Sequence, residues 1–211
     1  MIAIIDYGVG NLFSLRSSFA AIGEEAVVTS DAAVISQADR LILPGVGAFE
    51  DAAKKLSDSG MAEVVKREAQ SGKPIMGICL GMQLLLEKSY EYGEHEGLGL
   101  IPGVVRPIAD VIPKGYKIPH IGWNALTFTK DEEGKPDKLF KYINEGDYVY
   151  FVHSFYASDC EEATIATTEY GATLTAAVAN GNVYGCQFHP EKSGDVGMRI
   201  LKAFCEMEVD G

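Results

Sequence analysis

The sequence predicts an α/β fold, a three-layer sandwich with a mostly parallel central sheet covered by helices on both faces and a strand-rich second half. In the first half, short apolar runs alternate with helical patterns, which is typical of parallel strands joined by crossover helices. In the second half, strand-like runs follow one another with few helical patterns between them. No linker-like stretch divides the chain, so we expect one domain over residues 1–211.

Four short apolar runs predict the strands of the first half: Ile2–Ile5, Ala26–Thr29, Arg40–Leu43 and Ile75–Ile78. After the first run, Asn11 can cap a helix, and Gly23 ends it. The apolar face of this helix consists of Leu12, Leu15, Phe19 and Ile22. Further helical patterns run from about Phe49 to Ser71, with a break near Gly60, and from about Leu80 to Lys88.

Seven runs predict strands in the second half: Val104–Ile108, Lys117–Ile121, Ala125–Thr129, Tyr148–Val152, Thr164–Glu169, Thr175–Ala179 and Val183–Phe188. Asn180-Gly181-Asn182, between the last two, is a hairpin signal. The polar segment Asp131–Pro136 is expected to be an exposed loop, and so is the acidic, glycine-rich segment Tyr90–Gly99 with His95. A final helix is expected over about Asp195–Met207.

Composition and charge exclude several classes of protein. The formal net charge of −12 disfavours a nucleic-acid binder and a protein attracted to anionic lipid. The four cysteines form no disulfide framework and no CxxC pair, and no apolar run reaches the length of a membrane span. The chain opens on a strand-like run instead of a signal peptide, so we expect a cytoplasmic protein with reduced cysteines.

The segment Gly77-Ile78-Cys79-Leu80-Gly81 has the form of a nucleophile elbow, with cysteine in the place of serine. It follows an apolar strand and precedes a helical pattern, and at a helix N-terminus the dipole favours an anion. We therefore predict that Cys79 is a nucleophile, with a structural cysteine in a glycine-rich turn as the alternative. The remaining cysteines, Cys160, Cys186 and Cys205, are expected to be structural.

A free thiol is mostly protonated at neutral pH, so a cysteine nucleophile needs a base. His189 is the strongest candidate, because it closes an apolar strand that Pro190 brings to an end. Residues i and i+2 of an extended chain point the same way, so Glu191 can orient His189. A surface His-Pro-Glu turn is the alternative. A zinc site is disfavoured, because Cys186 and His189 face opposite sides of a strand and no second ligand pair is near.

Two glycine loops, Gly8–Gly10 and Gly45–Gly47, also follow predicted strands, at the sheet edge where ligand sites form. The first lacks the third glycine of a dinucleotide fingerprint, and a plain turn stays open for it. The second can bring the backbone N–H groups of Val46 and Gly47 near the sulfur. Together with the N–H of Leu80, they can bind the oxyanion of a tetrahedral intermediate.

The segments Gly77-Ile78-Cys79-Leu80-Gly81-Met82-Gln83 and Phe188-His189-Pro190-Glu191 together resemble the class I, or triad, glutamine amidotransferases. Five further segments resemble the glutaminase subunits of imidazole glycerol phosphate synthases: Asp6–Leu12, Leu43–Phe49, Ile118–Asn124, Tyr150–Phe155 and Gln187–Ser193. The resemblance extends from one end of the chain to the other. It implies a single glutamine amidotransferase domain that needs no cofactor and no metal.

The resemblance also implies roles for single residues. Cys79 attacks the side-chain amide of glutamine and forms a thioester, His189 transfers the protons, and Glu191 orients His189. The glutamine pocket is lined by Gly47, Gln83, His153, Ser154 and Phe155. Phe155 stands where a tyrosine is common in the family, and Ala179-Asn180 replaces a more polar pair. The first departure removes a hydroxyl, and the second leaves the role of that hairpin open.

The implied partner is a synthase (cyclase) subunit of the (β/α)8 type, bound as a heterodimer, which receives the ammonia for histidine biosynthesis. Asn11, Tyr150 and Lys192 are the candidates for the side that faces it, and Lys192 can pair with an acidic residue across the interface. We expect weak activity without the partner. The alternatives are a glutaminase for another pathway, a stand-alone cysteine amidase and a binding subunit without catalysis.

Overall fold

The computed structural model describes residues 1–208, and its centre is an eight-stranded mixed sheet. Five strands at one side of the sheet are parallel, in the order β2 (Ala26–Thr29), β1 (Ile2–Ile5), β3 (Arg40–Leu43), β4 (Ile75–Ile78) and β14 (Val183–Cys186). Beyond β14 the order continues, with antiparallel pairs, through β13 (Thr173–Asn180), β12 (Thr164–Glu169) and β9 (Thr127–Phe128). This confirms the predicted α/β class with its mostly parallel sheet.

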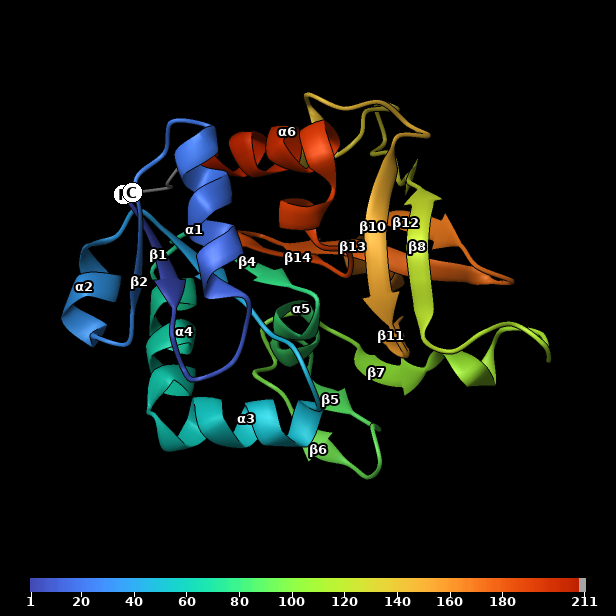
Figure 1. Ribbon diagram of the computed structural model, residues 1–211, viewed down its shortest axis with the longest axis horizontal. Coiled ribbons are helices and arrows are strands. Elements are labelled where there is room, and N and C mark those ends of the chain that lie inside the picture. Colours follow the sequence, from blue (N-terminus) through green and yellow to red (C-terminus); the bar gives the residue numbers. More distant parts are fainter. Residues whose placement is uncertain (209–211) are drawn as a thin grey trace.

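Helices cover both faces of the sheet (Figure 1). One face is covered by α1 (Leu12–Ala21) and α6 (Gly194–Cys205), and the other by α2 (Ala32–Gln37), α3 (Phe49–Asp58), α4 (Met61–Gln70) and α5 (Leu80–Leu85). Side chains along a strand alternate between the two cores. On β1, Ile4 packs with the core under α1 and α6, whereas Ile5 packs with the core on the opposite face.

Two smaller sheets flank the carboxyl ends of the central strands. One consists of the antiparallel pair β8 (His120–Ala125) and β10 (Tyr148–His153). The other has the order β11 (Phe155–Ser158), β7 (Val104–Pro107), β5 (Lys88–Ser89) and β6 (His95–Glu96). Short 3-10 helices complete the assigned elements: Ile108–Asp110, Lys138–Phe140, Glu161–Ala163 and Pro190–Lys192.

The predictions for the first half are largely confirmed. All four strands have the predicted bounds, and the left-handed Gly60 separates α3 from α4. Two details were wrong. The helix after Cys79 ends at Leu85 because Lys88 enters strand β5, and the side chain of Asn11 makes no capping hydrogen bond although the residue stands at the N-cap position of α1.

The second half differs more from its predicted pattern. The runs Lys117–Ile121 and Ala125–Thr129 become one long strand, β8, and the two-residue strand β9. The final strand ends at Cys186 and the final helix at Cys205, both earlier than predicted. The hairpin is confirmed, since Asn180 pairs with Val183 across the turn. Asp131–Pro136 is an exposed turn, as expected. Within residues 1–208, no helix is long and apolar enough to cross a membrane.

Candidate active site

Cys79 stands on a sharp turn between strand β4 and helix α5, with a backbone φ of 56° that a non-glycine residue rarely adopts. The flanking glycines make this turn possible. A Cβ on Gly81 would lie 1.9 Å from the carbonyl oxygen of Leu43, and one on Gly77 would lie 2.6 Å from the carbonyl oxygen of Gly81. No side chain fits at either position, so the turn can pack directly against the end of β3.

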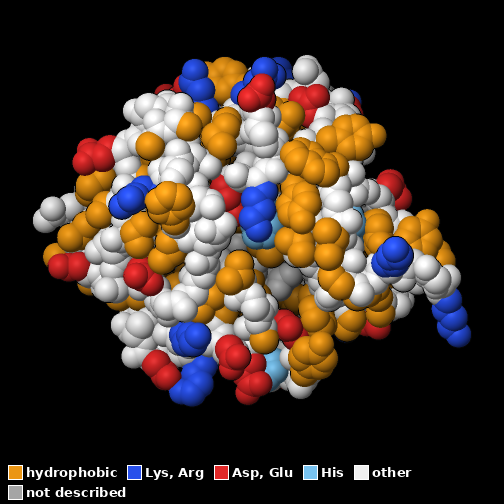
Figure 2. Space-filling model, in the orientation of Figure 1, with side chains coloured by type: hydrophobic (Ala, Val, Ile, Leu, Met, Phe, Trp, Pro, Cys, Tyr) orange, Lys and Arg blue, Asp and Glu red, His pale blue; other side chains and the backbone are white. Residues whose placement is uncertain are grey.

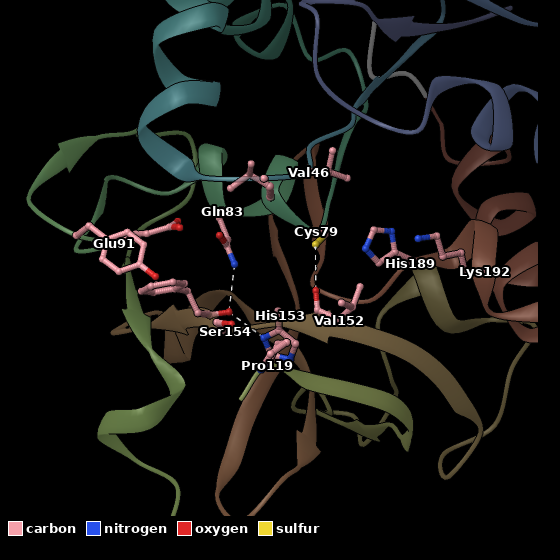
Figure 3. Close-up of a pocket in the computed structure, with 14 residues that line it drawn as sticks. Val46, Cys79, Gln83, Glu91, Pro119, Val152, His153, Ser154, His189 and Lys192 are labelled. Carbon is pink, nitrogen blue, oxygen red and sulfur yellow. Dashed lines mark hydrogen bonds between the residues drawn. The ribbon is translucent and has the colours of Figure 1, made fainter. Parts of the chain in front are cut away.

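The sulfur of Cys79 is almost completely enclosed, since the residue is 8% exposed. The Sγ atom lies 3.9 Å from the carbonyl oxygen of Val152, to which the thiol can donate (Figure 3). It also lies 3.8 Å from the Nε2 of Gln187. Parallel pairing of β4 with β14 sets this neighbourhood, because Ile78 pairs with Cys186 and the N–H of Cys79 donates to the Cys186 carbonyl at 2.7 Å.

His189 lies beside Cys79 (Figure 3), and the carboxylate of Glu191 is bound to its other side. The Nδ1 of His189 is 2.8 Å from a carboxylate oxygen of Glu191, and the two side chains are 4% and 2% exposed. Burial by itself lowers the pKa of His189, but the hydrogen bonds to Cys79 and Glu191 outweigh it and raise the pKa to about 9. The backbone is fixed as well, since the His189 N–H donates to the Tyr150 carbonyl at 2.9 Å.

A cavity of about 440 Å³ opens at these residues. Ten of the predicted site residues line it: Val46, Gly47, Cys79, Leu80, Gln83, His153, Ser154, Phe155, His189 and Lys192. Glu191 lies behind His189, and Asn11 and Tyr150 do not line the cavity. Leu80 is the first residue of α5, so its N–H has no partner within the helix.

Two side chains, Gln83 and His153, fix the floor of the cavity by holding the Phe155 backbone. The Nε2 of Gln83 donates to the carbonyl oxygen of Phe155 at 3.1 Å and to the Oε1 of Gln187 at 3.0 Å. The Nδ1 of His153 is 2.8 Å from the same Phe155 carbonyl, and its Nε2 is 3.0 Å from the Nδ1 of His120. The Phe155 backbone is thereby held at the pocket without any role for a hydroxyl on its ring.

Glu91 lines the cavity and was missed from the sequence. Its side chain is buried, it accepts the N–H of Phe49 at 3.0 Å, and burial raises its pKa above the ordinary value. A carboxylate in this position can bind a cation, such as an ammonium group. The acidic segment Tyr90–Gly99 was expected to be a solvated loop, and nothing in its composition shows which of its acidic residues turns inward.

The arrangement supplies a nucleophile and a base at one wall of the cavity and an acidic residue at the opposite wall (Figure 3), with an orienting carboxylate behind the base. Among residues 1–208, no group of three or more His, Cys, Asp or Glu side chains could hold a metal ion.

Cys160, Cys186 and Cys205 are buried away from the cavity, and burial raises the pKa of each thiol.

Comparison with known proteins gives consistent results. The family model described as glutamine amidotransferase class-I matches residues 3–207. The chain is 52% identical over 208 residues to the imidazole glycerol phosphate synthase subunit HisH of Caldanaerobacter subterraneus, covering 98% of both chains. It is 47% identical over 203 residues to the protein of the same name in Aquifex aeolicus, covering 95% of this chain and 94% of the other.

Solved structures share the fold at lower sequence identity. A crystal structure described as glutamine amidotransferase superposes with a TM-score of 0.74 at 20% identity, covering 98% of both chains. The structure of PurLQS from Thermotoga maritima superposes with a TM-score of 0.72 at 18% identity, covering 97% of this chain and 96% of that one.

Proposed function

Because the chain belongs to the class I glutamine amidotransferase family, we propose that it hydrolyses glutamine to glutamate and ammonia as the glutaminase subunit of an imidazole glycerol phosphate synthase. In this role it supplies ammonia to a synthase partner that makes imidazole glycerol phosphate and aminoimidazole carboxamide ribotide in histidine biosynthesis. The observation that carries the chemistry is the convergence of Cys79, His189 and Glu191 at one cavity. We also propose that the chain acts in the cytoplasm as one domain.

The geometry supports a two-step acyl transfer. His189 takes the thiol proton of Cys79, and the sulfur attacks the side-chain carbonyl carbon of glutamine. The resulting oxyanion is bound by backbone N–H groups of Val46, Gly47 and Leu80. When the C–N bond breaks, His189 gives its proton to the nitrogen, which leaves as ammonia. Water then attacks the thioester, again with His189 as base, and glutamate leaves with the Cys79 thiol restored.

The cavity offers partners for several polar groups of the substrate. Glu91 is the buried carboxylate that can take the α-ammonium group, and it lies across the cavity from the sulfur (Figure 3). Gln83 uses both hydrogens of its amide nitrogen on the protein, which leaves its oxygen as an acceptor for the substrate. His153, Ser154 and Phe155 bind the substrate through their backbone, and Gln83 and His153 hold this segment in place.

The partner surface is proposed to lie over β8 and β10. Hydrophobic side chains gather there (Figure 2), and Ile121, Trp123 and Tyr148 are between 52% and 58% exposed. Lys192 lies at the edge of the cavity near this surface, and Tyr150 belongs to the same strand pair. We propose that these residues, with Asn11, face a (β/α)8 synthase subunit in a heterodimer, so that ammonia passes between the sites without release into water.

Ammonia release from glutamine tests the proposal, measured for the chain alone and with the cognate synthase and its nucleotide ligand. We expect weak release alone, strong stimulation by the partner, and loss of both in Cys79→Ala. Full activity without stimulation would identify a stand-alone cysteine amidase. No release under either condition would leave only a binding subunit.

A further inference from the structure

Gln187 is a completely buried residue that lies next to the nucleophile but does not line the cavity. Strands β4 and β14 pair in parallel with Ile78 opposite Cys186, so the following residues, Cys79 and Gln187, leave the sheet side by side. The Nε2 of Gln187 is 3.8 Å from the Cys79 sulfur. A polar amide in such a position is retained only when its hydrogen-bonding groups are satisfied, so its partners show what it does.

The orientation of this amide is fixed by Gln83. The Nε2 of Gln83 donates to the Oε1 of Gln187 at 3.0 Å, and its second hydrogen goes to the Phe155 carbonyl at 3.1 Å. Since both hydrogens of Gln83 point to acceptors, Gln187 must present its oxygen to Gln83. Its nitrogen is therefore turned toward the sulfur of Cys79, and a flipped amide would set two N–H groups against each other.

The charge on the sulfur changes during the proposed reaction, and the neighbours of the sulfur respond differently. The Val152 carbonyl at 3.9 Å can accept a hydrogen bond from the thiol but repels a thiolate. An amide N–H is a donor in every state, and its hydrogen bond strengthens when the acceptor becomes an anion. Donation from Gln187 therefore favours the thiolate over the thiol, both before attack and when the thioester breaks and the sulfur is the leaving group.

We propose that Gln187 is a catalytic hydrogen-bond donor to the Cys79 sulfur, aimed by Gln83, and that it stabilises the thiolate alongside His189. The inference rests on the proposed function of Cys79 as nucleophile. It also gives Gln83 two roles. Gln83 offers its amide oxygen to the substrate, and its amide nitrogen holds the Gln187 amide in place beside the sulfur. A substrate that displaces Gln83 thereby changes the donor at the nucleophile.

The test compares Gln187→Met, which keeps the shape and removes the donor, with Gln187→Glu, which places a carboxylate beside the sulfur. Cys186→Ala is the control for packing damage on the same strand. Alkylation of Cys79 by iodoacetamide is followed by peptide mass spectrometry between pH 5 and 10. We expect about tenfold slower alkylation at pH 7 in Gln187→Met, a larger loss in Gln187→Glu, and a shift of both rate profiles to higher pH.

Glutamine hydrolysis by the complex with the synthase provides the second measurement. Because Gln187 does not line the cavity, we expect a lower kcat with little change in KM. Alkylation needs no glutamine, so it reports on Gln187 even if the chain proves not to be a glutaminase. An alkylation profile of Gln187→Met that coincides with the unsubstituted protein, in a variant that folds, would overturn the proposal. Should Gln187→Met fail to fold, Gln187→Glu decides by the same criterion.

Discussion

Two buried histidine systems border the same cavity, and they differ in the group that stands behind each ring. His189 has the carboxylate of Glu191 at 2.8 Å, and its pKa is raised to about 9. His153 has no carboxylate partner. Burial lowers its pKa to about 4, and the hydrogen bond to the Phe155 carbonyl does not reverse this. Similar burial therefore gives a cation in one place and a neutral ring in the other, because Cys79 and the carboxylate of Glu191 both favour the charged form of His189.

His153 and its neighbour His120 form a pair of neutral imidazoles that has fewer N–H groups than its hydrogen-bond contacts require. His120 and His153 lie between two acceptors, with the Oδ1 of Asn124 at 2.8 Å from His120 and the Phe155 carbonyl at 2.8 Å from His153. Asn124 cannot be flipped, because its Nδ2 donates to the Glu169 carbonyl at 2.8 Å. The three contacts of this chain need three N–H groups, but two neutral imidazoles supply only two. A third proton would add a charge near His189, whose own charge lowers the pKa of His153.

Removal of the carboxylate is expected to give the largest effect. In Glu191→Gln the orienting group keeps its shape but loses its charge, so the pKa of His189 falls from about 9 and the imidazolium is no longer stabilised. We expect glutaminase kcat/KM in the presence of the partner to fall by about 10²–10⁴. Steady-state ammonia release measures this, and NMR titration of His189 measures the pKa.

Glu63→Gln serves as the control for the loss of one negative charge, because Glu63 is an exposed helix residue that forms an ion pair with Lys66 far from the catalytic residues in the chain. It should leave both readings unchanged. If Glu191→Gln retained the activity of the unsubstituted protein, Glu191 would have no orienting role, and the contrast between the two histidine systems would not matter for catalysis.

The local parts of this comparison could be predicted from the sequence. His189 and Glu191 are two residues apart around a proline, and the glycines flank Cys79 directly, so short-range rules suffice for both. The four strands of the first half were located for the same reason, since each is a buried apolar run bounded by turn residues. The short helix α2 was missed because six residues carry too little periodicity.

The remaining features depend on contacts between distant segments. Glu91 and Gln187 reach the site only through the packing of a loop and the register of two strands. Strands β5 and β6 have two residues each and exist because of their pairing, so no local pattern indicates them. The link between His120 and His153 forms across the β8–β10 pair, where the two residues stand opposite each other.

The two histidines should also make opposite contributions to stability against pH. The folded pKa of His153, about 4, is below its ordinary value of 6.5, so the unfolded chain binds more protons and stability falls as pH drops from 6.5 toward 4. The folded pKa of His189, about 9, is above that value, so its contribution is complete below pH 6.5 and is lost as pH rises toward 9. Each effect is roughly 3–4 kcal/mol at most.

Urea unfolding between pH 4.5 and 9.5 separates the two. His153→Asn should make the acid side of the stability curve shallower, and His189→Asn should do so on the alkaline side. The slopes of the unfolding free energy against pH are compared, and not the absolute free energies, because each substitution also removes hydrogen bonds. Equal slopes in both variants and the unsubstituted protein would mean that neither ring has the charge state assigned to it.

The smallest effect is expected from giving the neutral pair the carboxylate that it lacks. Asn124→Asp places an anion at the position 2.8 Å from His120, where an amide oxygen now accepts. We expect the pKa of His120, which burial now lowers, to rise because an opposite charge favours the protonated ring. The two imidazoles then take up the third proton at higher pH than in the unsubstituted protein, and NMR of the His120 and His153 ring nitrogens reports the change.

Asn124→Ala is the matched control, since it removes the same bond to the Glu169 carbonyl without adding a charge. Activity should fall less than in Glu191→Gln, because the new cation lies one ring farther from the sulfur and the positions of Cys79 and His189 are kept. The direction in which the pKa of His189 moves is also informative. A second cation beside His189 lowers the pKa of His189 by repulsion, so in Asn124→Asp the loss of stability on the alkaline side should be smaller and should end at lower pH. An unchanged His120 titration in Asn124→Asp would show that burial, and not the missing carboxylate, keeps the pair neutral.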